Sequence, residues 1–242
     1  MYVLSKARAT RFAIVTSLAV ASAGCAGGVR VSAAVDAAGA GMVDVATLAP
    51  DLRIDMRYAG GDNFVGTRID GYLAPRCYLH GDVARALARV QATLRARGES
   101  LVVYDCYRPV RAVRHFVRWA RDPDDQRNKS RYYPGIDKQR LFAEGYIAES
   151  SGHSRGATVD VGLLRCPPAA ICEAIDMGTG FDLFDPRSNT DSPLVEPRQR
   201  GNRQRLLQAM AAEGFSNYPM EWWHYMWRPE PTPRTAYDFA VR

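Results

Sequence analysis

The stretch Ser151-Gly-His-Ser-Arg-Gly-Ala-Thr-Val-Asp-Val-Gly-Leu163 predicts a buried strand that contains a carboxylate. Side chains alternate between the two faces of a strand. From Ala157 onward, one face therefore carries only Ala, Val and Leu, while the other carries Thr158, Asp160 and Gly162. His153 precedes the strand in a glycine-bounded turn, from which its side chain can reach the face of Asp160. The sequence thus predicts that a histidine and an aspartate converge over one face of this strand.

A histidine and an aspartate that converge in this way are candidate metal ligands. The alternative is a hydrogen-bonded His–Asp pair at the entrance of a strand. Two ligands do not complete a metal site, so the other stretches with reactive side chains must decide between these interpretations.

The second such stretch, Glu221-Trp-Trp-His-Tyr225, offers another histidine with a carboxylate three residues before it. Two histidines, one aspartate and a further carboxylate match a catalytic zinc site, where three protein ligands leave a position for water. Residues three apart on a regular strand face opposite sides. We therefore expect Glu221 just before the strand or at a bulge, with His224 inside it. The alternative is an aromatic core strand with a solvated glutamate.

The third stretch, Tyr104-Asp-Cys-Tyr-Arg-Pro109, places Arg108 between an expected strand end and a proline that begins a helix. A guanidinium stays charged at any working pH, so Arg108 can stabilise an oxyanion. Asp105 can hold it through a bidentate pair. The alternative is a structural Asp–Arg clamp of the loop.

Hydrophobic periodicity predicts the elements around these stretches. We expect an irregular region over 164–199 and a loop over 123–136. Because helices and strands do not alternate regularly, the pattern favours the α+β class over a doubly wound sheet. The chain has no phosphate-binding glycine loop, nucleophile elbow or His-Glu-x-x-His helix. The expected helices are 82–97, 109–120, 137–144 and 200–213, and the expected strands are 101–104, 157–163 and 221–227.

Residues 1–24 have the layout of an export signal, with a basic start, a short apolar run and small residues before Cys25. The apolar run is too short to span a bilayer as a mature helix. Two processing sites compete. Ala21-x-Ala23 suits ordinary cleavage, whereas Gly24-Cys25 resembles a bacterial lipobox with Cys25 as the lipidated residue. Ser22, where such boxes usually carry leucine, favours simple cleavage. We expect residues 25–46 to be a flexible tether and residues 47–242 to be the folded domain.

The charge pattern limits which classes of partner are expected. The chain of 242 residues has a net charge of +6, half of which lies in the signal segment, and it has no Lys/Arg run or basic aromatic stripe. Nucleic acid is therefore excluded as an expected partner. Membrane contact is expected only through a lipid anchor at Cys25, and the oligomeric state is left open.

Four cysteines remain without Cys25, and an even count in an exported protein predicts two disulfides with three possible connectivities. Cys166 and Cys172 are close in sequence and can close one loop, which leaves Cys77 for Cys106. A four-thiolate zinc site is the rival, but no Cys-x-x-Cys pair is present to start it.

Taken together, the three stretches resemble the D-alanyl-D-alanine dipeptidases of the vancomycin-resistance type, within the zinc D,D-peptidase superfamily that includes Hedgehog-like domains. The family patterns are Asp-x-Tyr-Arg-Pro, Ser-x-His-x-x-Gly-x-x-x-Asp and Glu-x-x-His. They occur here in that order, at 105–109, 151–160 and 221–224. The likeness runs from about Leu48 to the C-terminus. The chain departs from the family in its signal segment, its four mature cysteines and a longer 164–199 region.

This resemblance implies an α+β fold with a central antiparallel sheet and flanking helices, and one Zn²⁺ per chain. It also implies roles for individual residues. Glu221 would be the general base, and Arg108 would stabilise the tetrahedral intermediate with support from Asp105. The implied metal ligands are His153, Asp160 and His224, the implied contacts to the substrate amino end are Tyr58 and Asp182, and those to its carboxylate are Ser151 and Tyr72.

The resemblance implies an exported, periplasmic zinc dipeptidase that hydrolyses D-Ala-D-Ala in cell-wall metabolism, with a small dipeptide as its partner. A D,D-carboxypeptidase acting on peptidoglycan stem peptides is the rival enzyme, and Tyr58 and Asp182 argue against it because they would block extension of the amino end. A zinc-containing binding domain without turnover is the rival of another class. The presence of both Glu221 and Arg108 argues against that domain.

Overall fold

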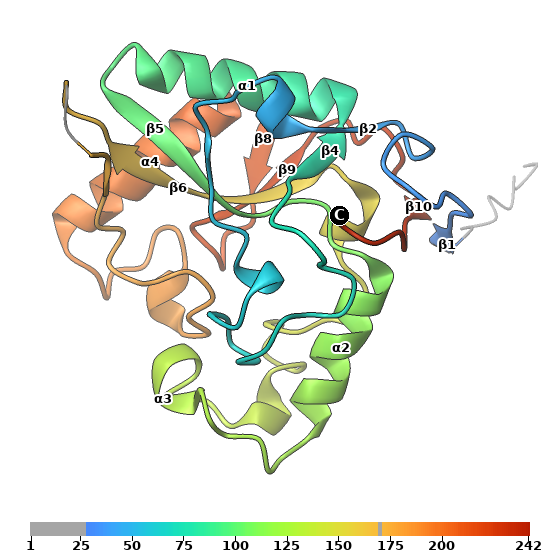
Figure 1. The fold of residues 1–242 in the computed structure, drawn as a ribbon. Helices are drawn as coiled ribbons and strands as arrows, with labels where there is room; N and C mark the ends of the chain where they lie inside the picture. Colours follow the sequence, from blue (N-terminus) through green and yellow to red (C-terminus); the bar gives the residue numbers. More distant parts are fainter. Residues whose placement is uncertain (1–27, 169–170) are drawn as a thin grey trace, which may run out of the picture.

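The computed structural model describes residues 28–168 and 171–242, and a six-stranded sheet forms its centre (Figure 1). The strand order is β3–β5–β6–β9–β8, with β7 paired to β6 outside this path. β3 joins β5 in parallel, and the other pairs are antiparallel. The bounds are Arg53–Ile54 for β3, Glu99–Asp105 for β5, Thr158–Arg165 for β6, Glu173–Ala174 for β7, Phe215–Asn217 for β8 and His224–Trp227 for β9.

The strand predicted from residues 157–163 is β6, and it lies between β5 and β9 in the middle of the sheet. All of its residues except Arg165 are buried. The apolar face of Val159, Val161 and Leu163 belongs to the main hydrophobic core. Asp160, on the opposite face, is only 2% exposed. The carboxylate of Asp160 is therefore held in a nearly dry environment.

The helices lie on both sides of this sheet (Figure 1). α1 (Gly81–Arg95) and α4 (Pro197–Ala211) pack against each other on one side, and α1 also contacts β5. α2 (Val110–Arg121) and α3 (Lys129–Tyr132) lie on the other side with the long loops. The α+β class is confirmed, as are the helices expected at 82–97, 109–120 and 200–213.

The helix predicted over 137–144 is wrong. A single 3-10 turn, Lys138–Arg140, occurs there, and α3 lies in the segment expected to be a loop. The ammonium of Lys138 is buried and donates to the carbonyls of Asp122 and Asp125 at 2.7 and 2.8 Å. Tertiary hydrogen bonds therefore determine the conformation of this region more than helix propensity does.

The predicted tether is also wrong over residues 30–46. β1 (Arg30–Val31) pairs in parallel with β10 (Thr235–Ala236), and β2 (Met42–Asp44) pairs in antiparallel with β4 (Tyr78–His80). Met42 and Val45 are buried in the core. The composition of this segment could not show that its strands pair with segments far away in the chain. The predicted signal segment 1–24 and Cys25 lie outside the described residues.

The cysteine pairs expected from the sequence lie at disulfide distance, Cys77 with Cys106 and Cys166 with Cys172. The first pair links the segment before β4 to the segment after β5, next to the chain turn that carries Arg108. Among the described residues, no helix is both long and apolar enough to cross a membrane.

Candidate metal centre and active site

Three adjacent strands bring reactive side chains into one row. Asp160 in β6 lies opposite His224 in β9 and opposite Asp105 at the end of β5. The register of β5 shifts between Val103 and Asp105, a bulge-like irregularity. Without this shift, Asp105 would lie opposite Val159 and its side chain would face the other side of the sheet. The irregularity therefore places Asp105 beside the candidate metal ligands.

His153 reaches this row from a 3-10 turn, Gly152–Arg155, that leads into β6. The hydroxyl of Ser151 caps the turn by accepting from the His153 amide at 3.2 Å. The ring Nδ1 lies 2.7 Å from the carbonyl oxygen of Cys106. A carbonyl can only accept, so Nδ1 carries the proton and donates it. The lone pair of Nε2 is left facing Asp160 and His224.

The residues that converge here fit a divalent cation. Nε2 of His153, Oδ1 of Asp160 and Nδ1 of His224 all lie within 4.8 Å of one another. Oδ1 of Asp160 is 3.3 Å from His153 Nε2 and 3.1 Å from His224 Nδ1, yet it is buried without a hydrogen-bond partner. The unprotonated Nε2 of His153 and Oδ1 of Asp160 are both acceptors, and a cation between them would relieve their repulsion. Two imidazoles and a carboxylate are the donor set of a catalytic zinc site with an open position.

The charge state of Asp160 suits this role. Burial alone would raise the pKa of Asp160, but the neighbouring His153 and His224 outweigh that effect and hold the pKa below its ordinary value. Asp160 is thus ionised at neutral pH, as metal ligation requires.

Glu221 lies in the turn immediately before β9, and His224 is the first residue of that strand, as expected from their spacing. The His224 amide lies 3.3 Å from the Glu221 carbonyl oxygen, and Oε2 of Glu221 is 3.5 Å from His224 Nδ1. Desolvation raises the pKa of Glu221 to about 7. A carboxylate with a pKa near neutrality is suited to both taking up and releasing a proton at neutral pH.

Arg108 forms the clamp with Asp105 and also lies at the cavity wall. Its Nε donates to Oδ2 of the fully buried Asp105 at 2.8 Å, which is the clamp, and Nη2 lies 3.6 Å from Oδ2 of Asp160. Its guanidinium carbon also lies 5.1 Å from the ring centroids of both Tyr58 and Phe116. Packed in this way, the guanidinium is fixed at the wall of the cavity beside the candidate metal ligands.

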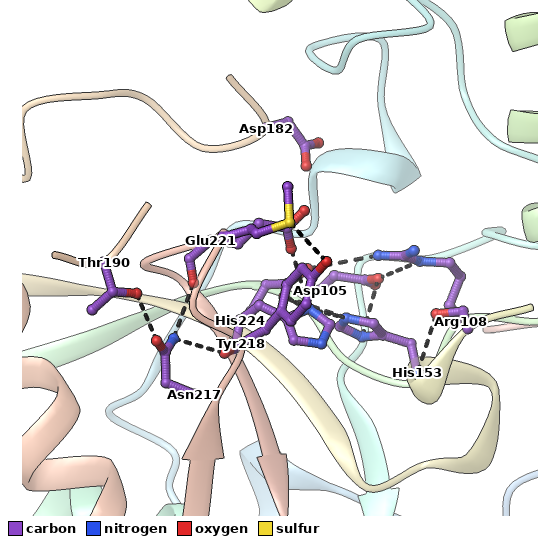
Figure 2. Close-up of polar contacts among 12 residues, drawn as sticks. Asp105, Arg108, His153, Asp182, Thr190, Asn217, Tyr218, Glu221 and His224 are labelled. Carbon is purple, nitrogen blue, oxygen red and sulfur yellow. Dashed lines mark hydrogen bonds and ion pairs between the residues drawn. The ribbon is translucent and has the colours of Figure 1, made fainter. Parts of the chain in front are cut away.

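A cavity of about 320 Å³ adjoins these residues and is lined by Arg108, Asp160, Glu221 and His224. Tyr58, Ser151 and Asp182 also line it, and the Tyr58 hydroxyl donates to Asp182 Oδ2 at 2.9 Å. Burial raises the pKa of Asp182 well above its ordinary value. Figure 2 shows Asp182 across the cavity from the row of Asp105, His153 and His224.

Tyr72 is the one predicted substrate contact that the structure does not bring to the cavity wall. It is fully buried, and its hydroxyl donates to Oδ1 of Asp105 at 2.6 Å. Asp105 therefore receives one hydrogen bond from Tyr72 and one from Arg108. This position makes Tyr72 a support of the Asp105–Arg108 pair.

Sequence reasoning missed two contributions to the site. The carbonyl of Cys106 sets the tautomer of His153, and no residue type marks a backbone acceptor. The ring of Phe116 in α2 packs against Arg108, and this contact depends on how α2 docks. Only the helical periodicity of α2 could have pointed to Phe116.

The chain is similar to known proteins over most of its length. Residues 38–242 match the family described as D-ala-D-ala dipeptidase. A protein named D-alanyl-D-alanine dipeptidase from Streptomyces coelicolor is 44% identical over 80% of this chain and 95% of its own length. Proteins of the same name from Enterococcus faecalis and Escherichia coli are 40% and 35% identical, over 78% and 76% of this chain and 93% and 83% of their own lengths.

Proposed function

The chain belongs to the D-Ala-D-Ala dipeptidase family of metallopeptidases, and from this premise we propose that it hydrolyses the dipeptide D-Ala-D-Ala to two molecules of D-alanine. One observation carries the proposal. One cavity is lined by Asp160 and His224 of the His–Asp–His group, by the half-buried Glu221 with a pKa near 7 and by the clamped Arg108. Hydrolysis of an amide bond by a metallopeptidase needs metal ligands, a general base and a group that stabilises the oxyanion.

We propose that the cation is one Zn²⁺ held by His153, Asp160 and His224. Nitrogen and carboxylate ligands with a fourth position left open favour zinc. When bound, the ion supplies Lewis-acid activation of a water molecule and of the scissile carbonyl.

The chain's own residues perform the remaining steps. Glu221 accepts the proton of the attacking water and passes it to the leaving amine, because its pKa lies close to the working pH. Arg108 donates hydrogen bonds to the oxygen on which negative charge develops. Asp105 and Tyr72 keep that guanidinium in place, so little reorganisation is needed when the charge forms.

Recognition of so small a substrate depends on its two ends. We propose that Asp182, with Tyr58, binds the ammonium group of D-Ala-D-Ala and that Ser151 contacts its carboxylate. A dipeptide offers little surface area, so a few buried polar contacts must supply the discrimination. Asp182 is 5% exposed, and its buried position supports exclusion of substrates extended at the amino end.

We also propose that the protein is exported to the periplasm through residues 1–24. The two cysteine pairs at disulfide distance support this, because disulfides persist in oxidising compartments. Lipidation at Cys25 and kinship with Hedgehog-like domains stay predictions.

The proposed function is tested by supplying D-Ala-D-Ala and, separately, an N-acylated pentapeptide ending in D-Ala-D-Ala to the zinc-loaded protein. We expect release of D-alanine from the dipeptide and little or none from the pentapeptide. Preference for the pentapeptide would instead identify a D,D-carboxypeptidase. Zinc binding without turnover of either substrate would identify a binding domain. Glu221→Ala should retain zinc while losing hydrolysis.

A further inference from the structure

The side chain of Asn217, at the end of β8, uses its hydrogen bonds on the segment that carries Glu221 and His224 (Figure 2). Its Nδ2 donates to the carbonyl of Glu221 and to the carbonyl of His224, both at 3.0 Å. Its Oδ1 accepts from the Thr190 hydroxyl at 2.6 Å. One amide group therefore binds the backbones of the candidate general base and a candidate metal ligand together.

The need for such a contact follows from the local geometry. Glu221 and His224 are three residues apart and could not face one ion from a regular strand. Here Oε2 of Glu221 and Nδ1 of His224 lie 3.5 Å apart, because residues 218–224 form a closed turn. In this turn the Glu221 amide donates to the Tyr218 carbonyl and the Tyr218 amide donates to the His224 carbonyl, each at 3.0 Å. Asn217 binds this turn through the carbonyls of Glu221 and His224. The relative position of the two side chains thus depends on a side chain that touches neither.

Thr190 orients the amide of Asn217. Thr190 is only 2% exposed, and its backbone amide donates to the Pro219 carbonyl at 2.9 Å. The Thr190 hydroxyl donates to Oδ1, so Nδ2 is turned toward the two carbonyls, which can only accept. Loss of this hydroxyl would remove one of the contacts that hold the amide in that orientation.

We propose that Asn217 is a positioning residue of the metal centre, which sets the separation of Glu221 and His224 and is itself oriented by Thr190. The inference rests on the proposed zinc-dependent function of that centre. A carboxylate cannot donate to a carbonyl, so Asn217→Asp replaces two attractive contacts with repulsive ones at nearly unchanged size.

The test compares Asn217→Asp, Asn217→Ala, Thr190→Val and Thr190→Ser with the wild type. For each protein, the zinc dissociation constant is measured by chelator competition, and kcat, KM and Tm are measured in parallel. We expect both Asn217 variants to bind zinc about 10- to 100-fold more weakly and to lose kcat by a similar factor, with KM nearly unchanged. Thr190→Val should show the same changes to a smaller extent, and Thr190→Ser should behave as the wild type because it keeps the hydroxyl.

Gln91→Glu serves as the matched control. The Gln91 side chain is also a buried amide. It forms hydrogen bonds with Ser100 and Leu101 near the start of β5, whereas Asp105 lies at the far end of that strand. This variant should lower Tm while leaving zinc affinity and kcat unchanged at a temperature below its unfolding transition.

The inference is overturned if the Asn217 variants keep zinc affinity and kcat within about twofold of the wild type. It is also overturned if Gln91→Glu lowers Tm, zinc affinity and kcat by as much as the Asn217 variants do. The effect would then be general destabilisation. If the Asn217 variants do not fold, the comparison of Thr190→Val with Thr190→Ser tests the inference. Equal zinc affinity and kcat in these two variants would overturn it. Failure of the wild type to bind zinc or to cleave D-Ala-D-Ala would contradict the proposed function instead.

Discussion

Arg108 serves both as a structural partner and as a group at the cavity wall. Its Nε donates to Asp105, its Nη2 lies 3.6 Å from Asp160 Oδ2, and the residue lines the cavity. A guanidinium has enough donors for both tasks, whereas an ammonium is a point charge on a flexible stem. The choice of arginine at this position therefore has a geometric reason as well as an electrostatic one.

We expect Arg108→Ala to lower kcat by about 10²- to 10³-fold, because the donors aimed at the developing oxyanion are lost. Arg108→Lys should recover only part of the rate, since it keeps the charge without the planar fork. Steady-state kinetics with D-Ala-D-Ala at saturating zinc measures kcat for the two variants and the wild type. A chelator competition on the same variants is the control, and their zinc affinity should stay close to that of the wild type. Retention of more than about one tenth of kcat in Arg108→Ala would show that another group stabilises the oxyanion.

The pH dependence of kcat/KM should reflect Glu221. Desolvation raises the pKa of its carboxyl to about 7 from the ordinary 4.5. A general base must be unprotonated, so kcat/KM should increase as the pH rises through that pKa. A bound cation favours the ionised carboxylate, so the midpoint should lie at or below about 7. The acid limb should persist in Asp182→Asn, although kcat/KM itself falls. A rate that decreases with rising pH between about 5 and 7 would contradict this assignment.

At the scale of elements, the end of β5 and the chain that follows it position most of the site. The irregular register turns Asp105 toward Asp160, the Cys106 carbonyl orients His153, and Arg108 follows two residues later. Cys106 also lies at disulfide distance from Cys77, in the segment that precedes β4. A disulfide at this place would limit how far the supporting groups of the candidate metal centre can move.

We expect the double variant Cys77→Ser/Cys106→Ser to have a free energy of unfolding about 3 to 4 kcal/mol below that of the oxidised wild type. The reason is that the Cys77–Cys106 pair closes a loop that spans 29 residues. Removal of the Cys166–Cys172 pair, which closes a loop of 6 residues, should cost about 2 kcal/mol. Denaturant unfolding compares the two double variants. Zinc affinity should fall only in the first of them. Equal losses of zinc affinity would show that the pair beside Arg108 has no special link to the metal centre.

For the whole molecule, the fold is closed by segments that are far apart in the chain. Residues 30–44 pair with β4 and β10, and the chain near Val241 pairs with Tyr72 through an isolated bridge. Both ends of the described chain therefore lie against the body that carries the site (Figure 1).

A chain that begins at residue 47 should lose about 3 to 5 kcal/mol of unfolding free energy relative to one that begins at residue 29. The shorter chain lacks the buried side chains of Met42 and Val45 together with the β2–β4 pairing. Urea unfolding of the two proteins measures the difference. Equal unfolding midpoints would support the tether that the composition of this segment suggests.

The sequence by itself determined the α+β class, the helices α1, α2 and α4, the strand β6, and the residue types that make a metal centre. These features are encoded locally, because periodic burial of apolar side chains and the spacing of reactive ones can be read from neighbouring positions. Even the expected place of Glu221, just before the strand that carries His224, followed from the periodicity of a strand.

The tertiary structure alone decided how those residues meet. The shifted register at Asp105, the tautomer of His153 and the hydrogen bonds of Asn217 each depend on backbone groups brought together from distant parts of the chain. The same is true of Tyr72, which lies behind Asp105, and of residues 30–46, which are part of the fold. Every residue other than proline carries the same backbone donor and acceptor, so no residue type announces which partner its carbonyl or amide will find.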